Sequence, residues 1–346
     1  MRYFHNDYNE ACHPAVMLKI QENLGKQMDG YGEDVVCEKA AAMIRKVCAD
    51  DSLFVHFLVG GTQTNLTVIS AALRPHQAAL GAQTAHIHVH ETGAIEATGH
   101  KVIGLPTMDG KINGAQIREY VRMHYADTAH EHVPQPKLVY LSNPTELGTI
   151  YSLSELKEIS AVCKKLNLYL FVDGARLGYG LAAKENDVTF ADLAQLTDVF
   201  YIGGTKVGAL FGEAVVISNK TLAEDFRYIM KQRGALLAKG WLLGLQYEAL
   251  MEDDLYLKIS SHADEMADRI RETLSELGYS LLVEGNTNQI FPILPDSLLD
   301  KLQKNFTFSE QVRVDVTHRA VRFCTSWATT PDAVEALCDE LKKLSK

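Results

Sequence analysis

Short apolar runs alternate with segments of helical periodicity along most of the chain. Five apolar runs predict buried strands at residues 53–59, 138–142, 168–172, 198–202 and 214–218. Helical periodicity predicts helices at 62–73, 154–166 and 221–251, with Thr62 and Ser154 placed as N-caps of the first two. Strands that alternate with helices in this way are typical of an α/β fold with a mostly parallel central sheet.

The pattern changes after about residue 254. A long amphipathic helix is predicted at 255–277, and a closing helix at 331–344. Four short strands are predicted between them, at 280–284, 288–294, 312–316 and 320–325. We therefore expect a large α/β domain over residues 1–253 and a smaller α+β domain over residues 254–346.

Composition narrows the class of protein. The 346 residues include 34 Lys and Arg against 44 Asp and Glu, a formal net charge of −10 that does not favour nucleic acid or an anionic membrane as partner. A local basic pocket for a small anion remains compatible with this charge. No uncharged apolar run of about 18 residues predicts a membrane span, and the N-terminal segment lacks the apolar stretch of a secretory signal. The six cysteines are scattered and form no CxxC motif. We expect a soluble cytoplasmic protein.

Three predicted strands are followed by polar, glycine-containing sequences: GGT at 60–62, DGAR at 173–176 and GGTK at 203–206. Ligands of open parallel sheets bind beyond the carboxyl ends of the strands, so we expect these segments to share one site. Glycine backbone and free helix N–H groups at 60–62 suit an anion, although a tight capped turn explains the same residues. The segment matches neither the dinucleotide nor the P-loop motif.

The charged members of these segments each have two interpretations. Asp173 could cap a turn, or could pair with a ligand cation such as a protonated pyridine nitrogen. Arg176 could bind a carboxylate or phosphate through two parallel hydrogen bonds, or form a surface ion pair. Lys206 stands in an otherwise uncharged segment, where burial would lower its pKa and make it a nucleophile able to form a Schiff base. A snorkelling lysine is the alternative.

His86, His88 and His90 alternate with apolar residues. On a strand these three side chains would share one face and could bind a divalent metal, as in some hydrolases. Alternatively, one imidazole packs on a flat cofactor and its neighbours are incidental. The spacing leaves both open, although no HExxH motif or carboxylate-rich loop stands nearby to complete a metal site.

Together these motifs resemble pyridoxal-phosphate enzymes of the aspartate aminotransferase fold (fold type I). Within them they resemble the threonine aldolase group of β-eliminating lyases, which includes phenylserine aldolase. The likeness covers nearly the whole chain, including HNDYNEACHP at 5–14, YGED at 31–34, DGAR at 173–176 and RFCTSWATT at 322–330. It implies a three-layer sandwich with a mostly parallel central sheet, joined to the smaller C-terminal domain.

The resemblance implies pyridoxal 5'-phosphate as the cofactor and gives each candidate residue a role. Lys206 would bind the cofactor covalently, Asp173 would pair with its pyridinium nitrogen, and His86 would stack on its ring. Small and basic residues would hold the phosphate: Gly61, Thr62, Thr205, Arg233 and Lys239. Four residues would contact the amino-acid substrate: Asn6, Tyr31, Arg176 and Arg322. The base would be His86 or His132.

The implied reaction is retro-aldol cleavage of the Cα–Cβ bond of a β-hydroxy-α-amino acid. L-Threonine or L-allo-threonine would give glycine and acetaldehyde, with low specificity. His90 stands where threonine-cleaving members often have tyrosine, which affects side-chain specificity more than reaction class. Alternatives are a phenylserine-type aldolase, β-elimination, racemisation or transamination, and in another class a metal-dependent hydrolase that uses His86, His88 and His90. Shared active sites would require a homodimer or homotetramer, in which Tyr31 reaches the partner's site.

Overall fold

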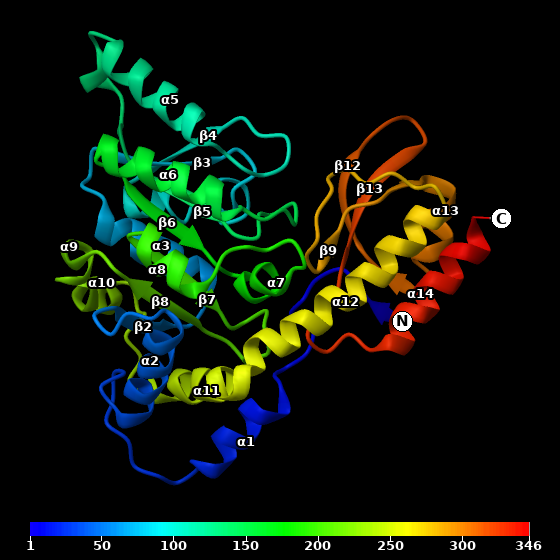
Figure 1. Ribbon diagram of the computed structural model, residues 1–346, viewed down its shortest axis with the longest axis horizontal. Helices are drawn as coiled ribbons and strands as arrows, with labels where there is room; N and C mark the ends of the chain where they lie inside the picture. The colour runs from blue at the N-terminus through cyan, green and yellow to red at the C-terminus, as the bar shows by residue number, and fades with distance from the viewer. Residues whose placement is uncertain (346) are drawn as a thin grey trace.

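The computed structural model describes residues 1–345, which form a seven-stranded central sheet with helices on both faces and a smaller C-terminal unit beside it (Figure 1). The strands follow the order β2-β8-β7-β6-β5-β3-β4 across the sheet. Their bounds are β2 Phe54–Leu58, β3 Gln77–Ala82, β4 Lys101–Leu105, β5 Gln135–Ser142, β6 Tyr169–Asp173, β7 Val199–Gly203 and β8 Glu213–Ile217. β8 runs antiparallel to both of its neighbours, β2 and β7, and the other six strands of this sheet all run in one direction. The predicted mostly parallel α/β sheet is therefore confirmed.

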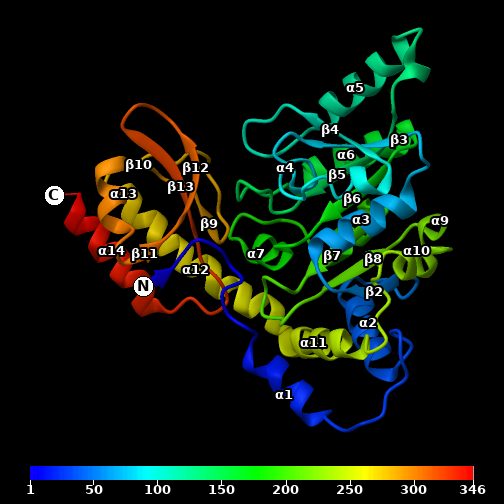
Figure 2. The ribbon, with the colours of Figure 1, turned by 180° about the vertical axis from the view of Figure 1, so that it is seen from behind.

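Helices cover both faces of the sheet (Figures 1 and 2). One face carries α5 Gly114–Ala126, α6 Leu153–Leu166 and α8 Phe190–Leu196, and the other carries α3 Gly61–Ala72 and α10 Phe226–Gln232. Beside edge strand β2, the helices α1 Pro14–Glu22 and α2 Val35–Val47 pack on α11 Trp241–Met251. The shorter elements are α4 His86–Val89, α7 Leu177–Ala182, α9 Lys220–Ala223, η1 Glu96–Thr98, η2 His130–His132 and η3 Glu252–Asp254. Because both faces are covered, every residue of β3, β7 and β8 is buried.

All five strands predicted for this sheet are present, but two others were not predicted. The missed strands are β3 and β4. The β3 sequence QAALGA contains no β-branched or aromatic residue, so strand propensity does not distinguish it from a loop or helix. Pairing with β5 on one side and β4 on the other holds it in the sheet.

Helix boundaries differ from the predictions where glycine and capping chemistry decide them. Gly60, not Thr62, occupies the N-cap position of α3, and Ser152, not Ser154, caps α6 through a reciprocal bond with Glu155. The helix predicted at 221–251 is divided into α9, α10 and α11, and Gly234 takes a left-handed φ of 71° just beyond α10. Among residues 1–345, no helix is long and apolar enough to cross a membrane.

The C-terminal unit combines three helices with a small antiparallel sheet. Its elements are α12 Leu255–Glu276, β9 Gln289–Ile290, β10 Ile293–Pro295, α13 Asp296–Leu302, β11 Phe306–Thr307, β12 Ser309–Arg313, β13 His318–Cys324 and α14 Pro331–Leu344. The strand predicted at 280–284 is wrong, because this segment makes a single bridge between Leu281 and Pro292. The strand predicted at 288–294 is divided into β9 and β10.

Two hydrophobic cores lie in the molecule, and α12 contributes to both. Ile259 and Ala263 belong to the core around the large sheet, whereas Met266 and Ile270 belong to the C-terminal core. The chain start joins the second core, because β1 Arg2–Tyr3 pairs in parallel with β11 and Phe4 is buried beside it. The predicted domain division between residues 253 and 254 stays a prediction. The start of the chain, assigned to the large domain in that prediction, packs in the core of the C-terminal unit.

Candidate active site

The three strand-end segments predicted to share a site meet at one edge of the sheet. Ser142 at the end of β5 pairs with Asp173 at the end of β6. The backbone N–H of Gly203, at the end of β7, donates to the carbonyl oxygen of Gly174 at 2.9 Å. A Cβ atom at Gly61, where α3 begins, would lie 3.2 Å from the hydroxyl of Tyr201 in β7. The turn before α3 and the ends of β5, β6 and β7 therefore surround one region.

Asp173 is an ionised carboxylate at the floor of this region, although only 4% of the residue is exposed. Tyr201 donates its hydroxyl hydrogen to one carboxylate oxygen at 2.5 Å, and Tyr140 donates to the other. The amide of Asn65 adds a bond of 3.1 Å. Burial would raise the pKa of Asp173, but the nearby charge of His86 and the tyrosine bonds outweigh it and lower the pKa. This carboxylate can therefore hold a cationic ligand group.

The segment of the three alternating histidines, which the sequence left without a predicted element, forms the helical turn α4, so the shared face that a strand would give does not arise. His86 and His90 lie on the same side, with ring centroids 5.6 Å apart, as residues four apart on a helix do. His88 points elsewhere, because a Cβ atom at Gly104 in β4 would clash with its ring. In the described residues 1–345, no group of three or more His, Cys, Asp or Glu side chains is arranged to hold a metal ion.

A buried acid orients His86. Nδ1 of His86 lies 2.7 Å from Oε1 of Glu91, whose side chain is fully buried. Asn65 donates one amide hydrogen bond to Glu91 at 2.7 Å and another to Asp173. With Glu91 as acceptor, Nδ1 carries the hydrogen and Nε2 is the imidazole atom that can receive a proton. A connected polar chain thus runs from Asp173 to His86.

Lys206 lies in the turn after β7 and is partly buried. Burial lowers its pKa, and the guanidinium of Arg176 lowers it further. The carboxylates of Asp7, Asp173 and Glu213 act in the opposite direction without cancelling the shift. A lysine whose amine is neutral at lower pH than usual is a better nucleophile, as the sequence predicted from its apolar surroundings.

Glu213, the first residue of β8, was not predicted from the sequence, and it stabilises the turn that carries Lys206. Its buried carboxyl accepts a bond from the Thr205 hydroxyl at 2.9 Å and from the Gly204 N–H at 3.1 Å. Burial raises the pKa of Glu213 to about 8. The backbone N–H of Thr205 donates to Gly212. Both Thr205 donors are therefore used within the turn, and neither is directed to the phosphate that the resemblance implies.

Arg176, predicted to bind a ligand carboxylate or to form an ion pair, uses two atoms of its planar fork on a carboxylate of its own chain. Its Nε and Nη2 atoms bind the two oxygens of Asp7 at 2.7 and 3.0 Å. Asp7 is fully buried and also accepts a bond of 2.9 Å from Asn288. Arg176 thus binds the N-terminal segment of its own chain, and its charge is already neutralised.

The positive charge of Arg322 is not balanced by a carboxylate among the described residues, unlike that of Arg176. Its Nη2 donates to the carbonyl of His5 at 2.9 Å and its Nη1 to the amide oxygen of Gln289 at 3.1 Å, whereas its buried Nε has no partner. No carboxylate forms an ion pair with Arg322 in the part of the chain that the structure describes. Asn6 lies between His5 and Asp7, so this N-terminal segment brings the two arginines together. A ligand carboxylate would supply the missing counter-charge of Arg322.

Three other predicted residues do not reach this region within one chain. The guanidinium of Arg233 donates to the hydroxyl of Ser70, in the third turn of α3, at 2.8 Å and so does not face the start of that helix. Lys239 is exposed next to Ala238, whose carbonyl accepts the N–H of Tyr31 at 3.3 Å. Tyr31 is also 43% exposed. Tyr31 and Lys239 thus lie on two surface loops that contact each other.

His132 lies at the wrong end of the sheet to act on a substrate held at Lys206 of the same chain. It is exposed in η2, just before β5 begins. Asp173 lies beside the last residue of β5, about 23 Å further along at about 3.3 Å per residue. His132 therefore lies far from Lys206 of the same chain, and its role as a base stays a prediction.

His90 is the histidine that joins His86 at the site. Burial lowers the pKa of His90, and the charges of His86, Arg322 and Lys206 lower it further. His90 therefore lies close to the cationic side chains of the site. Its spacing of four residues from His86 could have indicated this position had the segment been predicted as helical. The role of Tyr140 and Tyr201 as donors to Asp173 could not be predicted, because tyrosines are ordinary residues of apolar strands such as β5 and β7.

Known proteins are similar to this chain in sequence and in fold. Residues 13–296 match the family described as β-eliminating lyase. The chain is 30% identical, over 97% of its length and 96% of the relative, to the low specificity L-threonine aldolase of Pseudomonas aeruginosa. It resembles the structure of Leishmania major threonine aldolase with a TM-score of 0.98 at 44% identity, over 100% of both chains. An aspartate aminotransferase from Thermus thermophilus has the same fold, with a TM-score of 0.71 at 12% identity over 99% of this chain and 91% of that one.

Proposed function

The chain belongs to the β-eliminating lyase family, and from that premise we propose that it is a pyridoxal-phosphate-dependent aldolase of low specificity. Its proposed reaction is cleavage of L-threonine or L-allo-threonine to glycine and acetaldehyde. Lys206 and Asp173 lie at the carboxyl edge of the large sheet, and Arg322 from β13 lies near enough for its charge and that of Lys206 to act on the same side chain, His90. This convergence is the observation that carries the proposal. The full-length similarity to low specificity L-threonine aldolases supports the choice of substrate.

The residues at this edge fit pyridoxal phosphate. Asp173 is ionised and would keep the pyridine nitrogen protonated, and His86 offers a partly exposed aromatic ring. The first turn of α3 presents free N–H groups at Gly61 and Thr62 to a phosphate. When bound, the cofactor would accept the electrons released as the Cα–Cβ bond breaks.

The chain's own groups would orient the substrate and move its protons. Arg322 would bind the substrate carboxylate, which fixes the bond to be cleaved relative to the cofactor plane. We assign proton removal from the β-hydroxyl group to Nε2 of His86, because Glu91 holds the opposite nitrogen. Arg176 would keep the N-terminal segment closed over the site through Asp7.

We also propose an oligomer with shared active sites, a homodimer or a homotetramer. Tyr31 and Lys239 lie on two neighbouring exposed loops, and Arg227 binds the carbonyl oxygen of Tyr31 at 3.2 Å. Arg233 binds Ser70 in the third turn of α3 and so places no basic group at the start of that helix. A second chain could supply a basic group at that position.

A cytoplasmic location stays a prediction from composition.

A panel of β-hydroxy amino acids tests the reaction. L-Threonine, L-allo-threonine and phenylserine would each be assayed for aldehyde and glycine. Aldehyde and glycine in equal amounts are expected, whereas pyruvate and ammonia without aldehyde would show β-elimination and refute the aldolase.

Lys206→Ala tests the cofactor attachment. We expect the variant to lose the visible absorbance of bound cofactor and its borohydride-stable linkage to the chain. Lys101→Ala is the matched control, because Lys101 is exposed at the first residue of β4, the far end of the sheet. A linkage that survives in Lys206→Ala would disprove the assignment.

A further inference from the structure

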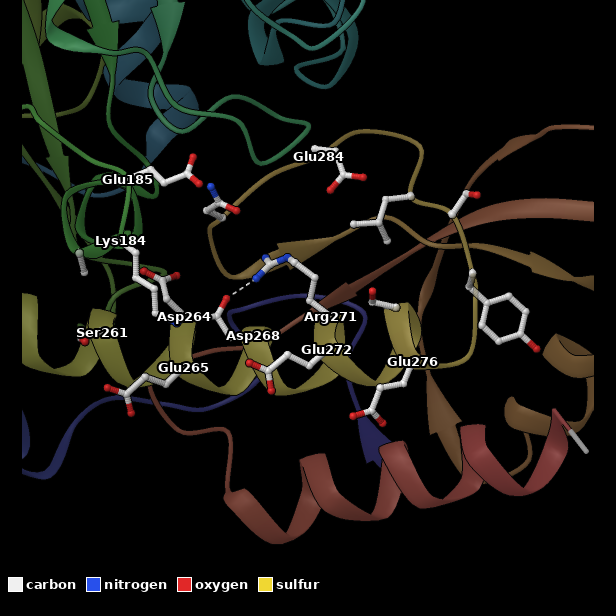
Figure 3. Close-up of a pocket in the computed structure, with 16 residues that line it drawn as sticks. Lys184, Glu185, Ser261, Asp264, Glu265, Asp268, Arg271, Glu272, Glu276 and Glu284 are labelled. Atoms are coloured by element: carbon white, nitrogen blue, oxygen red, sulfur yellow. Dashed lines mark hydrogen bonds and ion pairs between the residues drawn. The ribbon is translucent and has the colours of Figure 1, made fainter.

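Burial raises the pKa of two carboxyl groups that the site described above does not include, those of Asp264 and Glu146. Asp264 lines a cavity of about 830 Å³ between α12 and the segment at 279–286 (Figure 3). The backbone N–H of Asn288 binds its carboxyl group, and none of the described residues assigned to the candidate active site lines this cavity. Glu146 differs, because it contacts His86 directly.

Glu146 binds the start of the helical turn that carries His86. Its Oε1 atom accepts the backbone N–H of His86 at 2.8 Å. This N–H lies in the first turn of α4, where backbone donors have no partner within the helix, and the N-cap residue Ala85 offers no side-chain oxygen. The acceptor therefore comes from a residue 60 positions further along the chain.

The segment that carries Glu146 is itself held by hydrogen bonds. The hydroxyl of Ser142, at the end of β5, donates to Oε1 of Glu146 at 2.6 Å. The backbone N–H of Thr145 donates to the carbonyl oxygen of Thr149 at 2.8 Å, and the Thr149 hydroxyl donates to the carbonyl oxygen of Asp109 at 2.8 Å. The loop is thus closed on itself and tied to a neighbouring segment, so the oxygen that binds His86 has a defined position.

Two series of polar contacts therefore connect His86 with Asp173. The first is the polar chain described above, which ends at Nδ1 of the imidazole. The second reaches the backbone of His86 through Tyr140, Ser142 and Glu146. The hydroxyl of Tyr140, which donates to Asp173, lies 3.5 Å from Oγ of Ser142. One series orients the imidazole, and the other fixes the main chain from which the imidazole extends.

The contact depends on the length of the Glu146 side chain more than on its charge. Burial raises the pKa of Glu146 and the charge of Asp173 adds to this, whereas hydrogen bonds from Ser142, His86 and its own backbone oppose the shift. Oε1 can accept both of its bonds whether or not the carboxyl group is ionised, as an amide oxygen also could.

We propose that Glu146 is a positioning residue, which holds the backbone of His86 so that the imidazole lies over the site of the cofactor ring. The inference rests on the proposed function, in which His86 stacks on that ring and receives a proton. A displaced imidazole would slow the chemical step. Binding of the substrate carboxylate by Arg322 would be little affected, so the loss should appear in kcat rather than in KM.

Two substitutions separate the length of the side chain from its charge. Glu146→Gln keeps the length and an acceptor oxygen but removes the charge, whereas Glu146→Asp keeps the charge but is one methylene group shorter. We expect Glu146→Asp to lower kcat for threonine by roughly 10- to 100-fold with little change in KM, because small displacements of a reacting group are costly. It should also change the visible circular dichroism of the bound cofactor, which reports how the ring is held without any turnover. Glu146→Gln should match the parent protein in both measurements.

Glu155→Asp is the matched control. Oε2 of Glu155 accepts the backbone N–H of Ser152 at 2.8 Å at the start of α6, so this glutamate also supports a helix N-terminus. Helix α6 carries no residue assigned to the candidate active site. Shortening Glu155 by the same methylene group should therefore leave kcat and the visible circular dichroism at parental values.

Three results would overturn the inference. The first is a parental kcat in Glu146→Asp. The second is an equal loss in Glu146→Gln, which would show that the carboxylate itself is required. The third is the loss of cooperative unfolding in Glu146→Asp, which would make Glu146 a purely structural residue. A parent protein that releases no aldehyde from threonine would instead refute the proposed function, and the circular dichroism of its bound cofactor would still test the position of His86.

Discussion

The buried ion pair between Asp7 and Arg176 offers a quantitative test of how the site is held together. It joins the start of the chain to the residues after β6, with side-chain exposures of 0% for Asp7 and 11% for Arg176. Arg176→Gln would leave the Asp7 carboxylate with the amide of Asn288 as its side-chain donor. Asp7→Asn would leave a buried guanidinium without its counter-charge.

Removing one partner of a buried ion pair costs about 3–5 kcal/mol, mostly because the other charge stays buried and unpaired. Each single variant should therefore lose several kcal/mol in its free energy of unfolding. The double variant Asp7→Asn/Arg176→Gln removes both charges, so its loss should fall short of the sum of the single losses by about 1–3 kcal/mol.

Urea unfolding of the four proteins would measure these free energies. Protein concentration and saturating cofactor are held constant, because both binding and oligomerisation shift apparent stability. Arg122→Gln provides the surface control, since the ion pair between Arg122 and Glu119 is 66% and 54% exposed and should contribute at most about 1 kcal/mol. Single variants no less stable than this control, or strictly additive losses, would refute a structural role for the pair.

Three further predictions concern the site and its supports. Arg322→Ala should lower kcat/KM for threonine by roughly 10- to 150-fold while leaving cofactor absorbance intact, since a charged hydrogen bond contributes about 1.5–3 kcal/mol; unchanged kinetics would remove Arg322 from the carboxylate site. Glu213 has a pKa of about 8 in the folded protein against 4.5 ordinarily, so the folded state holds the extra proton and stability should fall as pH rises between these values. Glu213→Gln should lose that one-proton slope in unfolding midpoints measured across this range, and equal slopes would contradict the reasoning. Gly174→Ala places a Cβ atom 1.9 Å from the Tyr201 carbonyl oxygen and should lower the thermal midpoint, unlike Gly60→Ala, which meets open space.

Much of the fold could be predicted from local patterns in the sequence. The apolar runs at β5, β6, β7 and β8 could be predicted because strands covered by helices on both faces have nearly continuous apolar sequence. The edge strand β2 has a similar run although it is only partly buried. The glycines that follow them could be identified because close approach of two strand ends excludes a side chain, as Gly174 shows. β3 escaped prediction because its alanines and glycine favour no single state.

By itself the sequence determined the α/β class and the segments that meet at the carboxyl edge of the sheet, because hydrophobic periodicity and glycine requirements act over a few residues. Only the tertiary structure decided which charges compensate one another. It paired Arg176 with Asp7, whereas Arg322 in β13 binds only neutral groups, of His5 and Gln289. It likewise placed His132 just before β5 begins, far from Lys206 of the same chain. Ion pairs between residues far apart in the chain depend on distances that no local pattern encodes, because the fold sets those distances.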